Sequence, residues 1–339
     1  MSQGRRQDHV TTLRLAILGA GAMGARIADA ALRSGRFEVV AVVDPDRARA
    51  RALADRCRAT PYADVADLAR RGRADALDAV YVGTPNDVRL EVCRLAAEAG
   101  WHLLIDKPLA NTLAEADQIA AWADGSALTW MVGFSYRFRA PWRRARELIG
   151  AGRLGTARLV CDVIVESSRA TPQWYWDPAR GGGVLQLQSH HCIDRIRWLL
   201  DSPIVSLSGA ASRDHAGADH AAVLAGHLDN GASVTIALGF AVTYDGPART
   251  LFIAQGTDGL VQIDDAGTVS ITDDAGTRRE SFADDDWLAT ELRDFAAAID
   301  GGLADYPNLS DGRIALETAL GAARSAASSP AKPWSAWHG

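Results

Sequence analysis

A glycine-rich turn near the start of the chain constrains the fold more than any other feature. Gly19, Gly21 and Gly24 follow the spacing G-x-G-x-x-G, between an apolar run that begins at Leu13 and a segment with helical periodicity. The first glycine permits a tight turn, the second lets the backbone approach a pyrophosphate, and the third lets the helix pack close to the strand. Asp44 ends the next apolar run, where a carboxylate accepts hydrogen bonds from ribose hydroxyls. We therefore predict a dinucleotide-binding unit.

The predicted nucleotide site includes this turn and the ends of neighbouring strands. The N-terminus of the helix offers amide donors and the positive end of its dipole to an anion. A carboxylate at position 44 repels a 2′-phosphate, which favours NAD over NADP unless Arg47 or Arg49 turns toward that phosphate. The residues predicted to bind the cofactor are Gly19, Gly21, Ala22, Met23, Gly24, Asp44, Thr84, Pro85, Asn86, Asp106 and Lys107. The alternative, a glycine turn that binds nothing, is disfavoured because strand, glycines, helix and acid are all in register.

Short apolar runs alternate with helical segments through the first 135 residues. The runs lie at 13–19, 37–44, 77–84, 101–106 and 128–134. Such alternation is typical of βαβ units, in which helices cover both faces of a parallel sheet. We predict a doubly wound α/β Rossmann domain over residues 1–135, with residues 1–11 as a flexible tail.

The pattern changes after Arg153. Runs bounded by Gly, Asn or Asp predict strands at 157–166, 204–210, 220–229, 232–242, 249–255, 259–263 and 268–272. Helical periodicity returns from Asp286 and from Asp311. Because consecutive hairpins make antiparallel sheets, we predict an α+β domain over residues 136–339 with a largely antiparallel sheet, which would bind the substrate.

Charge and composition exclude several classes of function. The 339 residues include 36 basic and 42 acidic side chains, a net charge of −6, and 48% are hydrophobic. This predicts a globular protein without the basic surface that nucleic acid requires. The densest basic stretch, 137–146, is predicted to be a solvated helix face. The sequence lacks a run of about 18 apolar residues and an apolar segment near its start, so we expect a cytoplasmic protein outside the membrane.

The four cysteines do not indicate a metal site or a disulfide. Cys57, Cys93, Cys161 and Cys192 lie far apart, without the paired spacing of zinc sites or redox dithiols. We expect reduced, mostly buried thiols and no bound metal.

Lys107 is the first candidate for acid–base chemistry. The segment Asp106-Lys107-Pro108 ends a predicted strand at the carboxyl edge of the parallel sheet, where open α/β sheets bind ligands. Proline restricts the backbone beside the lysine, so the amine is positioned. Partial desolvation would lower its pKa toward the working pH. Taken alone, Lys107 is as well explained as a surface lysine.

Several motifs, in this order, resemble the Gfo/Idh/MocA family of glucose-fructose oxidoreductases and inositol dehydrogenases. They are the glycine turn 19–24, the segment 82–86, the triplet 106–108, the segment 132–138, the glycine run 181–183 leading to His191 and Asp194, and the pair Asp311-Gly312. The resemblance implies a Rossmann domain with an open-faced sheet domain, a nicotinamide nucleotide, and oxidation or reduction of sugars, polyols and related ring alcohols. It also implies that Lys107 is the catalytic lysine and His191 the catalytic histidine.

The helix that carries His191 has two predicted faces. Its apolar face, predicted to pack on the core of the second domain, comprises Leu185, Ser189, Cys192, Ile193, Ile196, Leu199 and Leu200. Leu187, His191 and Asp194 project from the other side, where a nicotinamide ring and substrate would cover Leu187. The alternative for His191 is a core histidine that bonds Asp194. His190 is either a substrate contact or an ordinary surface residue.

Three positions depart from the family pattern. Leu187 stands where many members place a carboxylate four residues before the histidine. Trp174-Tyr175 replaces a common Trp-Arg pair, and Arg89 replaces a histidine. The candidate substrate residues are Tyr136, Arg137, Trp174, Trp176, Asp177 and His190, and each has a structural role as its alternative.

The sequence therefore predicts an NAD(P)-dependent oxidoreductase. Hydride would move between nicotinamide C4 and a carbinol carbon of a sugar or cyclic polyol, with Lys107 and His191 exchanging the proton. Two alternatives remain: tightly bound NAD that assists elimination or glycoside cleavage, and a non-catalytic regulatory protein that binds NAD(P). An exposed sheet face favours a homo-oligomer, a dimer or a tetramer.

Overall fold

The computed structural model describes residues 11–71, 77–167, 171–213, 217–241 and 248–328. Almost all of the predicted tail, 1–11, lies outside the described residues. Within the described ranges, no helix combines the length and apolar character needed to cross a membrane.

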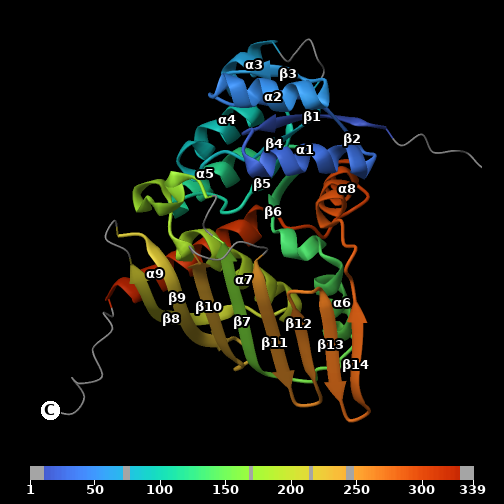
Figure 1. The fold of residues 1–339 in the computed structure, drawn as a ribbon, viewed down its shortest axis with the longest axis vertical. Coiled ribbons are helices and arrows are strands. Elements are labelled where there is room, and N and C mark those ends of the chain that lie inside the picture. The colour runs from blue at the N-terminus through green and yellow to red at the C-terminus, as the bar shows by residue number, and fades with distance from the viewer. Residues whose placement is uncertain (1–10, 72–76, 168–170, 214–216, 242–247, 329–339) are drawn as a thin grey trace, which may run out of the picture.

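The N-terminal part is a parallel sheet with helices on both faces, as predicted (Figure 1). Its elements are β1 (Leu13–Leu18), α1 (Ala22–Ser34), β2 (Phe37–Val43), α2 (Arg47–Cys57), β3 (Thr60–Tyr62), α3 (Val65–Arg71), β4 (Ala79–Val82), α4 (Arg89–Ala99), β5 (His102–Asp106), α5 (Leu113–Ala123) and β6 (Trp130–Gly133). The strand order β3-β2-β1-β4-β5-β6 is that of a Rossmann fold. The reversal of strand order beside β1 places a ligand crevice at the carboxyl ends of β1 and β4.

The C-terminal part is built on a larger sheet. Its elements are α6 (Ala140–Gly150), β7 (Ala157–Ser167), α7 (Val184–Leu200), β8 (Ile204–Arg213), β9 (Asp219–Leu228), β10 (Ser233–Ala241), β11 (Arg249–Gly256), β12 (Leu260–Asp264), β13 (Thr268–Asp273), β14 (Gly276–Ser281), α8 (Trp287–Ile299) and α9 (Leu309–Ser328). The order is β14-β13-β12-β11-β7-β10-β9-β8. All neighbours are antiparallel except β7 and β10, which confirms the largely antiparallel prediction.

Two helices return from the C-terminal sequence to the N-terminal sheet. Leu292 and Phe295 of α8 share a buried cluster with Leu15 and Ile17 of β1, and Figure 1 shows α8 beside α1. Helix α9 contacts β6 and α5 as well as β8 and α7. The division of the chain into domains at residue 135 remains a prediction. Helix α8 follows that boundary in the sequence but packs against the N-terminal part.

The basic stretch 137–146 is not a solvated face, so that prediction was wrong. Arg143 pairs with Asp294 of α8, and Arg144 pairs with Glu280 of β14 at 2.8 Å. The other arginines of the stretch are also engaged, in a buried ion pair (Arg137) or over aromatic rings (Arg139 and Arg146). The sequence pattern does not reveal these contacts, because the acidic partners of the arginines come from distant parts of the chain.

Candidate active site

The glycine turn has the shape that a dinucleotide needs. A side chain at Gly24 would bring its Cβ to 1.9 Å from the carbonyl oxygen of Gly19, and Gly19 itself has a φ of +105°. At Gly21, in contrast, an added Cβ would meet nothing within 4 Å. Helix α1 begins directly after Gly21 without a side-chain cap, so its first amides are available to an anion. These residues fit the pyrophosphate of a bound nucleotide.

Asp44 lies at the end of β2 and is buried, with 5% of its surface exposed. Its Oδ2 accepts a hydrogen bond from the Ala20 amide at 2.9 Å, which ties the carboxylate to the glycine turn. Its Oδ1 accepts from the Asp46 amide and from Arg49 at 3.1 Å. The carboxylate therefore supports the turn, and a guanidinium lies beside it.

Thr84 and Asn86 present polar atoms at the end of β4. Thr84 Oγ1 and Asn86 Oδ1 are buried and have no hydrogen-bond partner among the described residues. Asn86 Nδ2 donates to the Gly181 carbonyl at 3.5 Å, and Asp87 pairs with Arg180 at 2.8 Å. The residues before α7 therefore meet the edge of the parallel sheet, where Pro85 also lies.

Arg89, at the start of α4, is a structural residue that the sequence did not assign. It is 2% exposed, and it donates to the carbonyl groups of Thr84 and Asp106 at 2.8 Å each, and to that of Pro108. One buried guanidinium thus connects the ends of β4 and β5. The sequence shows that Arg89 departs from the family pattern. It does not reveal the three carbonyl partners, because tertiary structure brings them together.

Lys107 projects from the end of β5 toward α7. Its Nζ donates to the backbone carbonyl of Leu187 at 2.6 Å. Burial lowers the pKa of the amine, and the charges of Asp106 and Glu166 oppose this shift. Asp106 accepts from the Lys107 amide at 2.9 Å and from the Tyr81 hydroxyl at 3.2 Å. The chain has only two lysines, and the other, Lys332, lies outside the described residues.

His191 lies on α7 one turn after Leu187. Its ring meets the Tyr136 ring edge-on, with centroids 5.1 Å apart, and its Nδ1 has no partner among the described residues. Burial, followed by the positive charges of Lys107 and Arg195, holds the pKa of His191 well below its ordinary value. The imidazole is therefore neutral near pH 7 and able to accept a proton or a hydrogen bond.

Asp194 does not bond His191, so the alternative of a histidine paired with Asp194 was wrong. Both oxygens of Asp194 bind Arg137 in a buried pair, at 2.5 and 3.0 Å. Arg137 also contacts Asp311 at 3.1 Å. The structure thus gives Arg137 a structural role between η3 (Ser135–Phe138), α7 and α9, which was the alternative to substrate binding.

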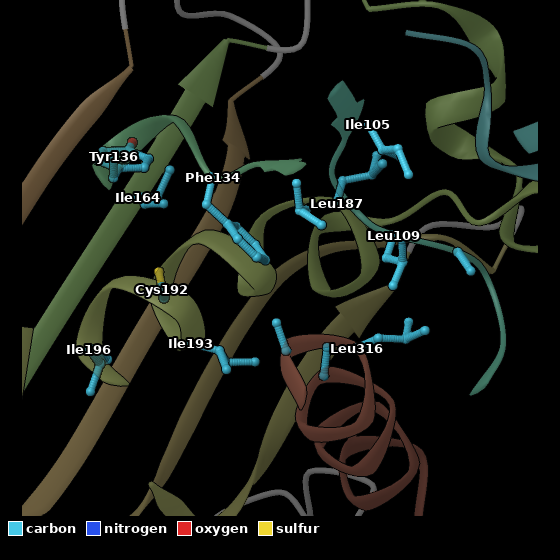
Figure 2. Close-up of a cluster of buried hydrophobic side chains, with 14 of the residues drawn as sticks. Ile105, Leu109, Phe134, Tyr136, Ile164, Leu187, Cys192, Ile193, Ile196 and Leu316 are labelled. Carbon is cyan, nitrogen blue, oxygen red and sulfur yellow. The ribbon is translucent and has the colours of Figure 1, made fainter. Parts of the chain in front are cut away.

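The predicted apolar face of α7 is buried against the larger sheet, but the opposite face differs from the prediction. Leu187 is 3% exposed and packs among Ile105, Leu109 and Leu316 (Figure 2), so protein side chains cover it and no ligand is needed. His190 is fully buried, and both of its ring nitrogens lack a partner among the described residues. The interpretation of His190 as ordinary surface was therefore wrong.

The remaining candidate pocket residues lie just before α7. Trp174 packs edge-on against Tyr175, with centroids 4.6 Å apart, and Trp176 packs against Phe240 of β10 at 5.5 Å. Asp177 accepts from the Ala179 amide and begins a short 3-10 helix. All three candidates are partly exposed, so their contribution to substrate binding remains a prediction.

Comparison with known proteins decides the family. One family model, described as oxidoreductase family, NAD-binding Rossmann fold, matches residues 13–134, and the GFO/IDH/MocA C-terminal domain model matches residues 142–262. The chain belongs to the Gfo/Idh/MocA family. As a member of this family it is an oxidoreductase with an NAD-binding Rossmann domain, as the glycine turn predicted.

Individual Gfo/Idh/MocA relatives match over different lengths. Inositol 2-dehydrogenase of Rhizobium meliloti is 28% identical over 93% of this chain and 97% of its own length. The 1-carboxy-3-chloro-3,4-dihydroxycyclohexa-1,5-diene dehydrogenase of Comamonas testosteroni is 30% identical over 70% of this chain, and the match spans 59% of that relative. An oxidoreductase domain protein of Kribbella flavida has the same fold, with a TM-score of 0.84 at 24% identity over 94% of this chain and 98% of that one.

Proposed function

We propose that this chain transfers a hydride between nicotinamide C4 and a secondary alcohol or ketone carbon of a sugar or cyclic polyol, with Lys107 and His191 as the acid–base pair. One observation supports this most strongly. The Lys107 amine, from the parallel sheet, lies 2.6 Å from the carbonyl of the residue one turn before His191, which belongs to the helix on the other sheet. This contact, together with the effect of the Lys107 charge on the pKa of His191, supports a shared site for the amine and the imidazole.

The protonation states of the two groups suit oxidation of an alcohol. When NAD is bound, it supplies the hydride acceptor. The lowered pKa of Lys107 gives a neutral fraction of the amine that takes the hydroxyl proton, and neutral His191 donates a hydrogen bond from its single ring N–H to the oxygen that remains. In the reverse direction the ammonium donates the proton to the carbonyl oxygen. The carbonyl of Leu187 holds the amine in position.

The substrate class rests on relatives and on the polar atoms of the site. A relative named for inositol matches nearly the full length of this chain, which supports a ring polyol. The buried acceptors His191 Nδ1 and Asn86 Oδ1 lack partners among the described residues, and such acceptors suit hydroxyl donors. A sugar or a cyclic polyol presents several hydroxyl groups to them.

A substrate panel tests the proposal. Purified protein is mixed with sugars and cyclic polyols and with NAD or NADP, and the absorbance of the reduced cofactor is followed. We expect at least one member to be oxidised, and Lys107→Met to lower kcat/KM roughly 10²- to 10⁴-fold while NAD affinity is retained. The control is Asp229→Asn in an exposed turn at the far end of the sheet. Parallel loss of turnover and NAD binding in Lys107→Met would contradict the assigned role, and substrate conversion without net NADH would indicate the elimination or glycoside-cleavage alternative.

We also propose that the chain assembles as a homodimer or homotetramer through the open face of the larger sheet. Val205 on β8 and Val223 on β9 are 59% and 61% exposed, which is unusual for apolar side chains on neighbouring strands. Sedimentation velocity should give the mass of a dimer or a tetramer, and Val223→Glu should shift the population toward the monomer. A monomer at micromolar concentration would contradict this proposal.

A further inference from the structure

The site lacks a carboxylate at the position where many Gfo/Idh/MocA members carry one. Leu187 occupies that position, and its side chain is part of the hydrophobic cluster shown in Figure 2. Only its backbone carbonyl reaches the site, where it accepts the hydrogen bond from Lys107. A carboxylate for the substrate would therefore have to come from another element.

Glu166 brings a carboxylate to this region from β7. It is the next-to-last residue of that strand, and it is partly exposed. The Gln188 side chain donates to Glu166 through Nε2···Oε2 at 2.6 Å. Gln188 directly follows Leu187, whose carbonyl binds the Lys107 amine. Adjacent residues of α7 thus bind the two groups: Gln188 binds the Glu166 carboxylate, and the carbonyl of Leu187 binds the Lys107 amine.

The side chain of Gln188, which binds Glu166, also lies one helical turn from His191. Residues three apart in a helix are neighbours on one face, and Gln188 precedes His191 by three. Gln188 is 3% exposed, so its amide is fixed rather than free in solvent. Its Oε1 is buried without a partner among the described residues, like Nδ1 of His191. Two polar atoms one helical turn apart on α7 are therefore left without partners among the described residues.

The charge of Glu166 acts on the same side chains that surround the reaction. Burial lowers the pKa of Lys107, and Glu166 together with Asp106 opposes that shift. Burial raises the pKa of Tyr175 to about 12, and the same two carboxylates add to it. Glu166 is thus electrostatically coupled to the amine in addition to its hydrogen bond with Gln188.

We propose that Glu166, held by Gln188, is a substrate-binding residue that accepts a hydrogen bond from a hydroxyl next to the reacting one. It takes over the contact that a carboxylate at position 187 would make. This inference rests on the proposed function, since it assumes a substrate with neighbouring hydroxyl groups. Gln188 is a positioning residue, because it acts on the substrate through Glu166.

The first test measures whether Glu166 shares a site with Lys107, and it needs no substrate. Lysine labelled with ¹³C at Cε gives two signals in the whole chain, those of Lys107 and Lys332. We expect Glu166→Gln to lower the pKa of Lys107, because a nearby negative charge is lost. Asp229→Asn, which removes an exposed carboxylate in a distant turn, should leave the pKa of Lys107 unchanged. An unchanged Lys107 pKa in Glu166→Gln would overturn the inference.

The second test measures the contact with substrate. With a polyol that the wild-type enzyme oxidises, we expect Glu166→Gln to raise KM roughly 10- to 100-fold, the range for a lost hydrogen bond to a charged group, with a smaller change in kcat. Gln188→Leu should also raise KM, and Glu166→Asp should recover part of the loss. Asp229→Asn should keep wild-type kinetics.

A series of deoxy substrates identifies the hydroxyl involved. For the analogue that lacks the hydroxyl bound by Glu166, the wild type and Glu166→Gln should have nearly the same KM. An equal effect of Glu166→Gln on every analogue would overturn the hydroxyl contact, as would an unchanged KM with the parent substrate. If no polyol or sugar is oxidised by the wild type, the proposed function fails and the substrate contact fails with it, whereas the NMR titration still decides whether Glu166 lies beside Lys107.

Discussion

The carboxylate oxygens of Asp44 already have protein partners, which a bound ribose would have to share. One oxygen supports the glycine turn through the Ala20 amide, and the other is bound by Arg49. A ribose with free hydroxyls can share these oxygens, whereas a 2′-phosphate is repelled by the carboxylate and attracted by the guanidinium. We therefore expect the choice between NAD and NADP to depend on the balance between these two adjacent side chains.

Asp44→Ser should shift this balance toward NADP. Removal of the negative charge leaves Arg49 free to pair with a 2′-phosphate, so the ratio of kcat/KM for NADP to that for NAD should rise about 10-fold or more. The measurement compares both cofactors with one substrate. The double variant Asp44→Ser, Arg49→Ala should lose most of this gain, and an unchanged ratio in the single variant would remove Asp44 from cofactor selection.

Individual residues were predictable from sequence where their role depends on local geometry. The glycine turn is an example, because the φ of +105° at Gly19 and the close approach of Gly24 to the Gly19 carbonyl follow from a strand–turn–helix connection alone. Partners from distant segments were not predictable: Asp194 was matched to His191 by spacing on one helix, but Arg137 takes it. Glu166 was missed for the same reason, since nothing in the sequence near position 166 points to Gln188.

Single helices and strands were likewise predictable where the local sequence determines them, and were missed where it does not. Strands with alternating or continuous apolar residues were predicted to within a few residues, but β3 and β14 were missed. Strand β3 has only three residues, and β14 is an exposed edge strand with the sequence GTRRES, which has no apolar period. The parallel pairing of β7 with β10 also escaped prediction, because it depends on the crossover through α7.

The side chain of Arg89, at the start of α4, joins the ends of β4 and β5. Arg89→Leu would leave the carbonyls of Thr84, Asp106 and Pro108 without this donor, at a cost of about 2 to 4 kcal/mol in the free energy of unfolding. NAD affinity should fall too, since both loops lie at the predicted nucleotide site. The matched control is Arg94→Leu on the same helix, a partly exposed residue paired with Glu91 and Glu98, which should lower the urea midpoint much less than Arg89→Leu. Equal urea midpoints for the two variants would contradict this role.

At the scale of the whole molecule, the pH dependence of the free energy of unfolding should reveal the lowered pKa of the buried His190. Burial, with the charges of Lys107 and Arg89, lowers the pKa of His190 to about 3. The unfolded chain takes up a proton at this residue below about pH 6.5, whereas the folded chain does not until about pH 3. Protons therefore favour the unfolded state, and stability is lost as the pH falls through this window.

His190→Gln should reduce this loss. At pH 5 the linkage at His190 amounts to about 2 kcal/mol, and a side chain that does not titrate removes it. Thermal unfolding between pH 7.5 and pH 5 should show a shallower decline of Tm in His190→Gln than in the wild type. His227→Gln, at an exposed histidine, should follow the wild type. A decline as steep in His190→Gln as in the wild type would contradict the effect.

The hydrogen bond between Lys107 and the carbonyl of Leu187 spans the two halves of the molecule. The amine comes from the parallel sheet and the carbonyl from the helix that lies on the larger sheet. If the halves separate, water reaches the ammonium, the desolvation ends, and the amine regains the basicity of a free lysine. We therefore expect the basicity of this amine to depend on how closely the two halves are packed, with the lower pKa when the interface around Lys107 is closed.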